Sequence, residues 1–319
     1  MERERTSVGR HPGEGSERAD FCVIGDWADG SPEWLAARHE GIGASDTPSI
    51  LDVPGSYKTK LQVWMEKVNK ESQDIENERL LEILEFGHKM EPVIAETLEE
   101  RTGMKVVPES RTLGHATYPF IRANLDGWIE IDGVMVPAEF KNVNEFMGSR
   151  WEEEPPLVFN VQLQHQMYVV GAERGVLAAV IGGNRFVYAI IERNEKFQEQ
   201  MVRALLNFWD DVENNNMPSG VAEDIDLLKN LFETEEAKET VLPDEARDWA
   251  AAIEEAKEAI KKWTQLQKDA EAKIWQALGD AGVGELPGGG GFKVVRVNKE
   301  PYTVAASSYK YLKQIKVKE

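Results

Sequence analysis

Two carboxylates and a lysine, Asp126, Glu139 and Lys141, are spaced so that they could hold a metal ion. An Asp132-Gly133 pair lies between them, flanked by two runs of alternating apolar residues, and this pattern predicts a two-residue type I′ hairpin turn. That turn places Asp126 directly opposite Glu139 on the neighbouring strand. Lys141, two residues further along, projects from the same face.

Like charges at opposed strand positions repel, so this pair requires a neighbouring cation. Two carboxylates beside a lysine offer the hard oxygen ligands that divalent cations prefer. The side chain of Phe140 is predicted to lie in the core, while its carbonyl could face the metal. The alternative is a surface cluster in which Lys141 neutralises both acids on a solvated strand.

The register also follows from the apolar pattern, because it pairs Leu125 with Phe140 and two further apolar couples on one face. Helices and further strands must hold this hairpin in place. Period-2 and period-3.6 patterns predict strands at 125–131, 134–141, 176–181 and 186–191, and helices at 158–170 and 195–216. A helical pattern over 78–101 contains Gly87 and Pro92, which indicates either a kinked helix or two helices meeting near Met90.

Four segments follow from composition and charge. We expect a flexible leader at 1–30, a main domain at 31–220, an acidic helical arm at 221–291 and a basic C-terminal segment at 292–319. The arm contains a heptad pattern from Trp249 to Ala277. In order of preference, this heptad face predicts packing within the chain, a self-association helix or a docking site.

The chain of 319 residues has a net charge of −20 and one cysteine, Cys22. It contains no apolar run long enough to span a membrane and no signal-peptide pattern, so we expect a soluble, cytoplasmic protein. One cysteine excludes an internal disulfide and an iron–sulfur cluster. His88 and His165 lack a partner at ligand spacing, which predicts packed or surface histidines. The negative charge on its own argues against a nucleic-acid partner.

Longer motifs carry a resemblance. The stretch from Trp34 to Asp46 (WLAARHEGIGASD) resembles the opening motif of the YqaJ-type viral recombinase family, also called the phage lambda exonuclease family. Four further motifs, in the family's order, resemble the rest of its nuclease domain: FGHKMEP at 86–92, NLDG at 124–127, EFK at 139–141 and NVQLQ at 160–164. The family belongs to the PD-(D/E)xK nuclease superfamily.

The resemblance implies a restriction-endonuclease-like α/β core, a mixed central sheet flanked by helices, to which the C-terminal helical arm is appended. It implies a Mg²⁺-dependent 5′-to-3′ exonuclease, with Mn²⁺ as a substitute, acting on linear double-stranded DNA. The 3′ overhangs would serve phage-type homologous recombination in a bacterial host. It also implies a single-strand annealing protein as partner and a ring-shaped homotrimer.

By the same resemblance, the metal ligands are Asp126, Glu139, the Phe140 carbonyl and Glu91. Lys141 orients or deprotonates the attacking water or neutralises phosphate charge, and the residues leave these roles open. Gln162 hydrogen-bonds that water or a phosphate oxygen. Arg38, Ser45 and Asn124 bind the 5′-phosphate of the DNA, since all three side chains can donate hydrogen bonds to phosphate oxygens.

Two other functions compete with this interpretation. One is a different nuclease on the same core, such as a structure-specific or restriction-type endonuclease. The other is a non-catalytic acidic interaction protein that binds through its arm. The intact set of Asp126, Glu139 and Lys141 argues against the second, because a non-catalytic protein has no need of all three.

Overall fold

The computed structural model describes residues 21–28, 30–69, 78–145, 151, 154–231 and 239–298. The chain divides into two units, Met1–Leu228 and Lys229–Glu319. The predicted boundary at residue 220 therefore lies close to the observed one. No helix within the described ranges is both long enough and apolar enough to cross a membrane.

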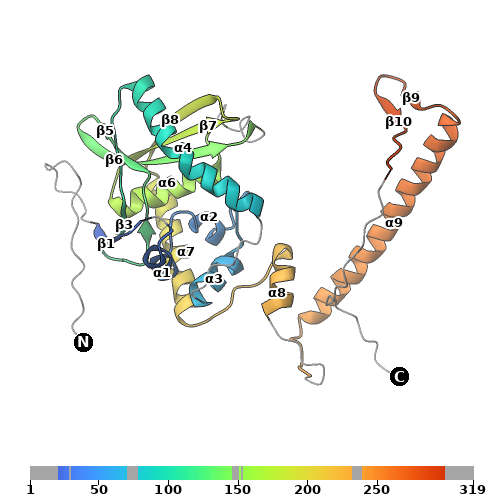
Figure 1. Cartoon of the computed structure of the whole chain (residues 1–319). Coiled ribbons are helices and arrows are strands. Elements are labelled where there is room, and N and C mark those ends of the chain that lie inside the picture. Colours follow the sequence, from blue (N-terminus) through green and yellow to red (C-terminus); the bar gives the residue numbers. More distant parts are fainter. Residues whose placement is uncertain are drawn as a thin grey trace. The chain divides into compact units, whose positions relative to one another are not determined.

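The first unit is built on a five-stranded mixed sheet in the order β2-β5-β6-β7-β8 (Figure 1). Its strands are β2 (Val106–Val107), β5 (Gly127–Ile131), β6 (Val134–Val143), β7 (Arg174–Ile181) and β8 (Arg185–Glu192). Strands β6 and β7 are parallel, and the other neighbours are antiparallel. The predicted mixed α/β sheet is confirmed.

Helices cover both faces of the sheet. The 25-residue helix α4 (Glu78–Thr102) buries Ile94 and Leu98 against one face, in a cluster with Ile129, Val136 and Phe140. The opposite face is covered by α6 (Leu157–Val170), the crossover helix that parallel neighbours require. Leu163 of α6 packs so closely on Gly175 of β7 that a Cβ there would lie 2.8 Å from its side chain.

Helix α4 runs through Pro92 as a single element, so the alternative of two helices meeting near Met90 is wrong. Burial of Ile94 and Leu98 just beyond the proline stabilises the continuous helix, which offsets the missing backbone hydrogen bond. Helix α7 (Glu195–Glu213) follows β8 and ends three residues before the predicted limit.

A smaller sheet packs beside these layers. It contains β1 (Cys22–Asp26), β3 (Arg111–Gly114) and β4 (Arg122–Ala123), in the order β1-β3-β4. Strand β1 falls inside the stretch predicted as a leader, and Phe21 beside it is fully buried against Trp128. The predicted end of the leader at residue 30 is therefore wrong, because this short apolar stretch finds a sheet edge and a core partner.

Three short helices lead toward the site: α1 (Pro32–His39), α2 (Thr47–Ile50) and α3 (Lys60–Asn69). Ser31 caps α1 by accepting a hydrogen bond from the Trp34 N–H at 3.2 Å. Helix α2 packs against α6 and α3. This arrangement brings the chain around residues 38–46 against the helix that also covers β6.

The second unit contains the 33-residue helix α9 (Ala246–Leu278) and a hairpin of β9 (Val283–Glu285) and β10 (Gly291–Lys293). Helix α8 (Ile225–Leu231) spans the boundary between the units. The predicted heptad helix is confirmed as α9. The basic segment predicted at 292–319 is described only to residue 298, and its remainder lies outside the described residues.

Candidate active site

The β5–β6 hairpin forms as its sequence predicts. Asp132 and Gly133 adopt φ of 54° and 77°, the positive values of a type I′ turn. Ile131 pairs with Val134 and Gly127 with Ala138, which confirms the predicted register. The apolar face of the hairpin lies against α4. Successive side chains of a strand point to opposite faces, so Glu139, next to Phe140, faces α6.

Asp126 lies immediately before β5 and accepts a hydrogen bond from the Phe140 N–H at 2.6 Å. This contact joins the start of one strand to the middle of the other. Glu139 is buried, with 6% of its surface exposed. Burial raises the pKa of Asp126 well above its ordinary value, and the nearby charges of Glu139 and Glu91 raise it further. Crowded carboxylates of this kind favour a bound cation.

Lys141 forms an ion pair with Glu139, and its ammonium lies 5.5 Å from the ring centre of Phe159 on α6. Burial lowers the pKa of Lys141, but the charges of Glu139 and Asp126 outweigh this and leave the pKa above its ordinary value. Lys141 is therefore a firmly charged cation in this arrangement, and it is not a solvated surface lysine.

Sequence reasoning missed one functional side chain, Gln166. It lies on α6, is 1% exposed, and donates its amide N–H to Glu139 Oε2 and to the Asn124 carbonyl, the latter at 3.3 Å. Its Oε1 is buried and has no hydrogen-bond partner among the described residues. Gln162, also buried, lies one helical turn earlier on α6.

Glu91 reaches the site from α4. Its side chain is 35% exposed, and Oε1 lies 3.2 Å from Nδ1 of the exposed His88. The charge of Glu91 contributes to raising the pKa of Asp126, after burial and the charge of Glu139. In the described part of the chain, however, no three carboxylate, histidine or cysteine groups are already drawn together as a metal would hold them. The chemistry of the donors, two opposed carboxylates with a third nearby, still fits Mg²⁺.

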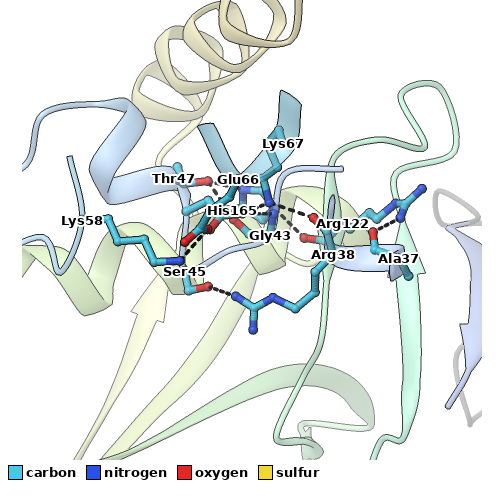
Figure 2. Close-up of polar contacts among 11 residues, drawn as sticks. Ala37, Arg38, Gly43, Ser45, Thr47, Lys58, Glu66, Lys67, Arg122 and His165 are labelled. Carbon is cyan, nitrogen blue, oxygen red and sulfur yellow. Dashed lines mark hydrogen bonds and ion pairs between the residues drawn. The ribbon is translucent and has the colours of Figure 1, made fainter. Parts of the chain in front are cut away.

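Arg38 and Ser45 lie together in a second cluster, shown in Figure 2. Arg38 Nη2 donates to Ser45 Oγ at 3.4 Å, and its guanidinium lies 4.8 Å from the ring centre of Trp34. Ser45 is exposed. Asn124, predicted to join them, instead donates to Thr112 Oγ1 at 3.2 Å, and its carbonyl accepts from Gln166. The contacts of Asn124 thus place it beside the carboxylate cluster.

A buried ion pair supports the backbone beneath Arg38. Lys67 Nζ of α3 lies 2.7 Å from Asp46 Oδ2 and 2.8 Å from the Arg38 carbonyl, and both side chains are 3% exposed (Figure 2). The same Asp46 oxygen accepts from the Gly43 N–H at 3.0 Å. Burial opposes ionisation of Asp46, but the charges of Lys67 and Arg38 hold its pKa well below the ordinary range. The loop that carries Ser45 is therefore held before Ser45, at the Arg38 carbonyl and the Gly43 N–H, and after it, at Asp46.

His165, next to Gln166 on α6, is fully buried. Its Nε2 lies 2.8 Å from the Arg122 carbonyl and its Nδ1 2.7 Å from Thr47 Oγ1. Burial lowers the pKa of His165 to about 4. The neutral ring donates from Nε2 and accepts at Nδ1, so the prediction of a packed histidine is confirmed. Through His165 and Gln166, α6 contacts both clusters.

Comparisons with known proteins found similar sequences and similar solved structures. Residues 33–173 match the model of the YqaJ-like viral recombinase domain. The uncharacterised protein YqaJ of Bacillus subtilis strain 168 is 34% identical over 260 residues, which cover 79% of each chain. Among solved structures, an alkaline exonuclease from Laribacter hongkongensis is 18% identical, with a TM-score of 0.48, over 63% of this chain and 97% of that one. A phage-related exonuclease from Haemophilus somnus 129PT is 12% identical, with a TM-score of 0.42, over 57% and 99%.

Proposed function

Because the chain belongs to the YqaJ-like viral recombinase family, we propose that it is a metal-dependent nuclease that degrades linear duplex DNA from its 5′ ends. The single observation that carries this proposal is the cluster of Asp126, Glu139 and Lys141, in which Lys141 pairs with Glu139 and both charges act on Asp126. The 3′ single strands left behind would be substrates for a single-strand annealing protein in homologous recombination. A ring-shaped trimer, in which each copy presents one such site, is part of the proposal.

Mg²⁺, or Mn²⁺ in its place, would be held by Asp126, Glu139, the Phe140 carbonyl and Glu91. When bound, it would supply positive charge to the phosphate and lower the pKa of a water molecule. In the ion-free arrangement the charges of Glu139, Lys141 and Glu91 all act on Asp126, although no group of three ligands among the described residues is already drawn together as a metal would hold it. Lys141, which pairs with Glu139 in this structure, would supply positive charge to the phosphate beside the metal ligands.

Lys141 acts in this proposal as a charge stabiliser, because its ammonium is placed beside the carboxylate cluster by its ion pair with Glu139. Its ammonium offers three donors to phosphate oxygens. Gln162, buried on the helix that faces Glu139, would hydrogen-bond the attacking water or a phosphate oxygen.

Gln166 has a positioning role. It fixes one oxygen of Glu139 by donating a hydrogen bond, which orients the carboxylate for the metal. Its second amide atom is a buried acceptor without a donor among the described residues, an arrangement that is costly unless water or substrate fills it. We therefore assign its Oε1 to a water molecule of the loaded site.

Arg38 and Ser45 would bind the 5′-phosphate of the DNA end. The guanidinium and hydroxyl already share a hydrogen bond, so both groups face the same small volume. The Lys67–Asp46 pair holds the backbone that carries them and therefore reduces the ordering needed on binding. Asn124, near Glu139 and Gln166, would contact the same end of the DNA from the side of the carboxylates.

The test compares end-labelled linear duplex DNA, with and without a 5′-phosphate, against closed circular DNA, in Mg²⁺ and in EDTA. We expect Mg²⁺-dependent release of label from 5′ ends, faster on phosphorylated ends, and intact circles. Lys141→Met should abolish it, whereas Lys60→Met, which removes a surface lysine paired with Asp52, should not. Cleavage of closed circles would instead support an endonuclease, and hydrolysis unaffected by EDTA would refute the metal site.

A further inference from the structure

Helix α9 carries a continuous apolar face that its own unit leaves uncovered. Its 33 residues span about 50 Å. Apolar residues recur at alternating steps of four and three along it, and the large ones are exposed: Trp249 by 59%, Ile253 by 47%, Ile260 by 66% and Trp263 by 64%. No residue of α9 is buried in the described structure. A helix of this length with a sustained heptad face is typical of one that pairs with another helix.

The sizes of the residues on this face distinguish between two orientations of a helix pair. One set of heptad positions contains Trp249, Ala256, Trp263, Ala270, with Ala277 last. A parallel pair stacks each of these on its own equivalent, so layers of two tryptophans alternate with layers of two alanines. Such alternation leaves voids between overfilled layers, which close packing disfavours.

An antiparallel pair matches large residues with small or medium ones. When Ile260 of one helix faces Trp263 of the other, the same register sets Ile253 against Ala270. The remaining layers pair Trp249 with Ile274 and Ala256 with Gln267. Each of these four layers then contains at least one residue larger than alanine, and no layer contains two tryptophans. Only the layer at the helix ends, Ala246 with Ala277, contains two alanines. Large and small side chains alternate across the interface, as a well-packed core requires.

Charge along α9 favours the same orientation. Its first half, residues 246–260, has four acidic and two basic side chains, whereas its second half, residues 261–278, has two acidic and four basic ones. A parallel pair places acidic half beside acidic half and basic half beside basic half. An antiparallel pair places each acidic half beside a basic one, which complementary charges stabilise.

We propose that α9 pairs with the α9 helix of a second copy of the chain in antiparallel orientation. The sizes of the residues on the apolar face and the distribution of charge along α9 both identify a second α9 helix as the partner. The contact is isologous, as expected for a two-fold dimer. It uses the second unit alone, so it is independent of the proposed hydrolysis and of any assembly of the first unit.

The oligomeric mass of the full-length protein tests this pairing by light scattering after size-exclusion chromatography. We expect Ile260→Glu combined with Trp263→Glu to halve the mass, because four carboxylates would be buried in the central layers. Ala272→Glu is the matched control, since it lies on the opposite side of α9 and should leave the mass unchanged. Circular dichroism checks that both variants remain helical. Equal masses for wild type and the double variant would overturn the proposal.

Cysteine cross-linking tests the orientation. Ala256→Cys and Gln267→Cys chains are prepared separately, mixed, allowed to exchange and oxidised. In the antiparallel register, position 256 of one copy lies beside position 267 of the other, so disulfide-linked dimers should form in the mixture and not with either variant alone. Cross-linking of each variant alone would show a parallel pair, and an absence of cross-links in every sample would show that this face has another occupant; either result overturns the proposal.

Discussion

Replacing Asp126 with asparagine should abolish hydrolysis and yet stabilise the metal-free protein. The hydrogen bond from the Phe140 N–H survives, because an asparagine carbonyl accepts it equally well. The change removes one of two like charges on opposed strands. A loss of activity together with a gain in stability distinguishes an electrostatic site from a structural one.

The magnitude follows from the geometry. Opposed side chains of a hairpin lie about 5 Å apart, and two unit charges at that distance repel by about 3 kcal/mol at an effective dielectric constant of 20. The ion pair between Lys141 and Glu139 offsets part of this repulsion. We therefore expect a net stabilisation of about 1–2 kcal/mol, which for a unit of this size raises the melting temperature by about 2–8 °C.

Thermal unfolding in EDTA and in Mg²⁺ provides the assay. Wild type should gain stability when Mg²⁺ is added, because the ion binds only the folded state. Asp126→Asn should melt higher than wild type in EDTA and gain little from Mg²⁺. Glu130→Gln is the matched control, since it removes an exposed carboxylate from the same strand. An asparagine variant that melts lower than wild type in EDTA would refute the electrostatic argument.

Three further outcomes follow from the structure. Gln166→Leu should raise the Mg²⁺ concentration needed for half-maximal activity by about 10-fold, and calorimetric titration of the ion should show the same loss; unchanged affinity would remove the positioning role of Gln166. Arg38→Ala should lower the preference for 5′-phosphorylated over hydroxyl ends by about 10-fold, whereas equal slowing on both ends would contradict phosphate binding. Because the folded-state pKa of His165, about 4, lies below its ordinary value, acid protonates the unfolded chain first, and stability is lost as pH falls from above 6.5 towards 4. Between pH 7 and pH 4.5 wild type should lose about 2 kcal/mol more than His165→Gln in denaturant unfolding, and parallel losses would show that His165 does not titrate this way.

Local rules were sufficient to predict the hairpin. Asp132-Gly133 specifies both the turn and the register, and the apolar alternation agrees with it, so the pairing of Gly127 with Ala138, next to Asp126 and Glu139, follows from the amino-acid sequence alone. These are short-range constraints, in which a dipeptide and a period of two determine the geometry. The longer helices and strands were predicted for the same reason.

Features that depend on distant contacts could not be predicted. Gln166 is one of three buried glutamines on α6, and only the position of Glu139 across the β6–α6 contact shows which one touches the carboxylate. The ion pair between Lys67 and Asp46 joins residues 21 positions apart through the packing of α3 on the loop before α2. Neither contact leaves a period or a turn signature in the sequence, because both are set by how the helices pack.

The net charge of −20, which on its own argues against a nucleic-acid partner, is compatible with DNA binding at this site. In the proposed function, Glu139, Asp126 and Glu91 would hold a cation. The basic groups near the two clusters are few: Lys141 pairs with Glu139, and the backbone of Arg38 is anchored by the buried Lys67–Asp46 ion pair. Attraction for DNA would then be strongest in this small region, since the protein as a whole carries a net charge of −20. A nuclease built this way should bind the interior of a duplex weakly and depend on the phosphate at its end, and this dependence is a consequence of where its few cations are placed.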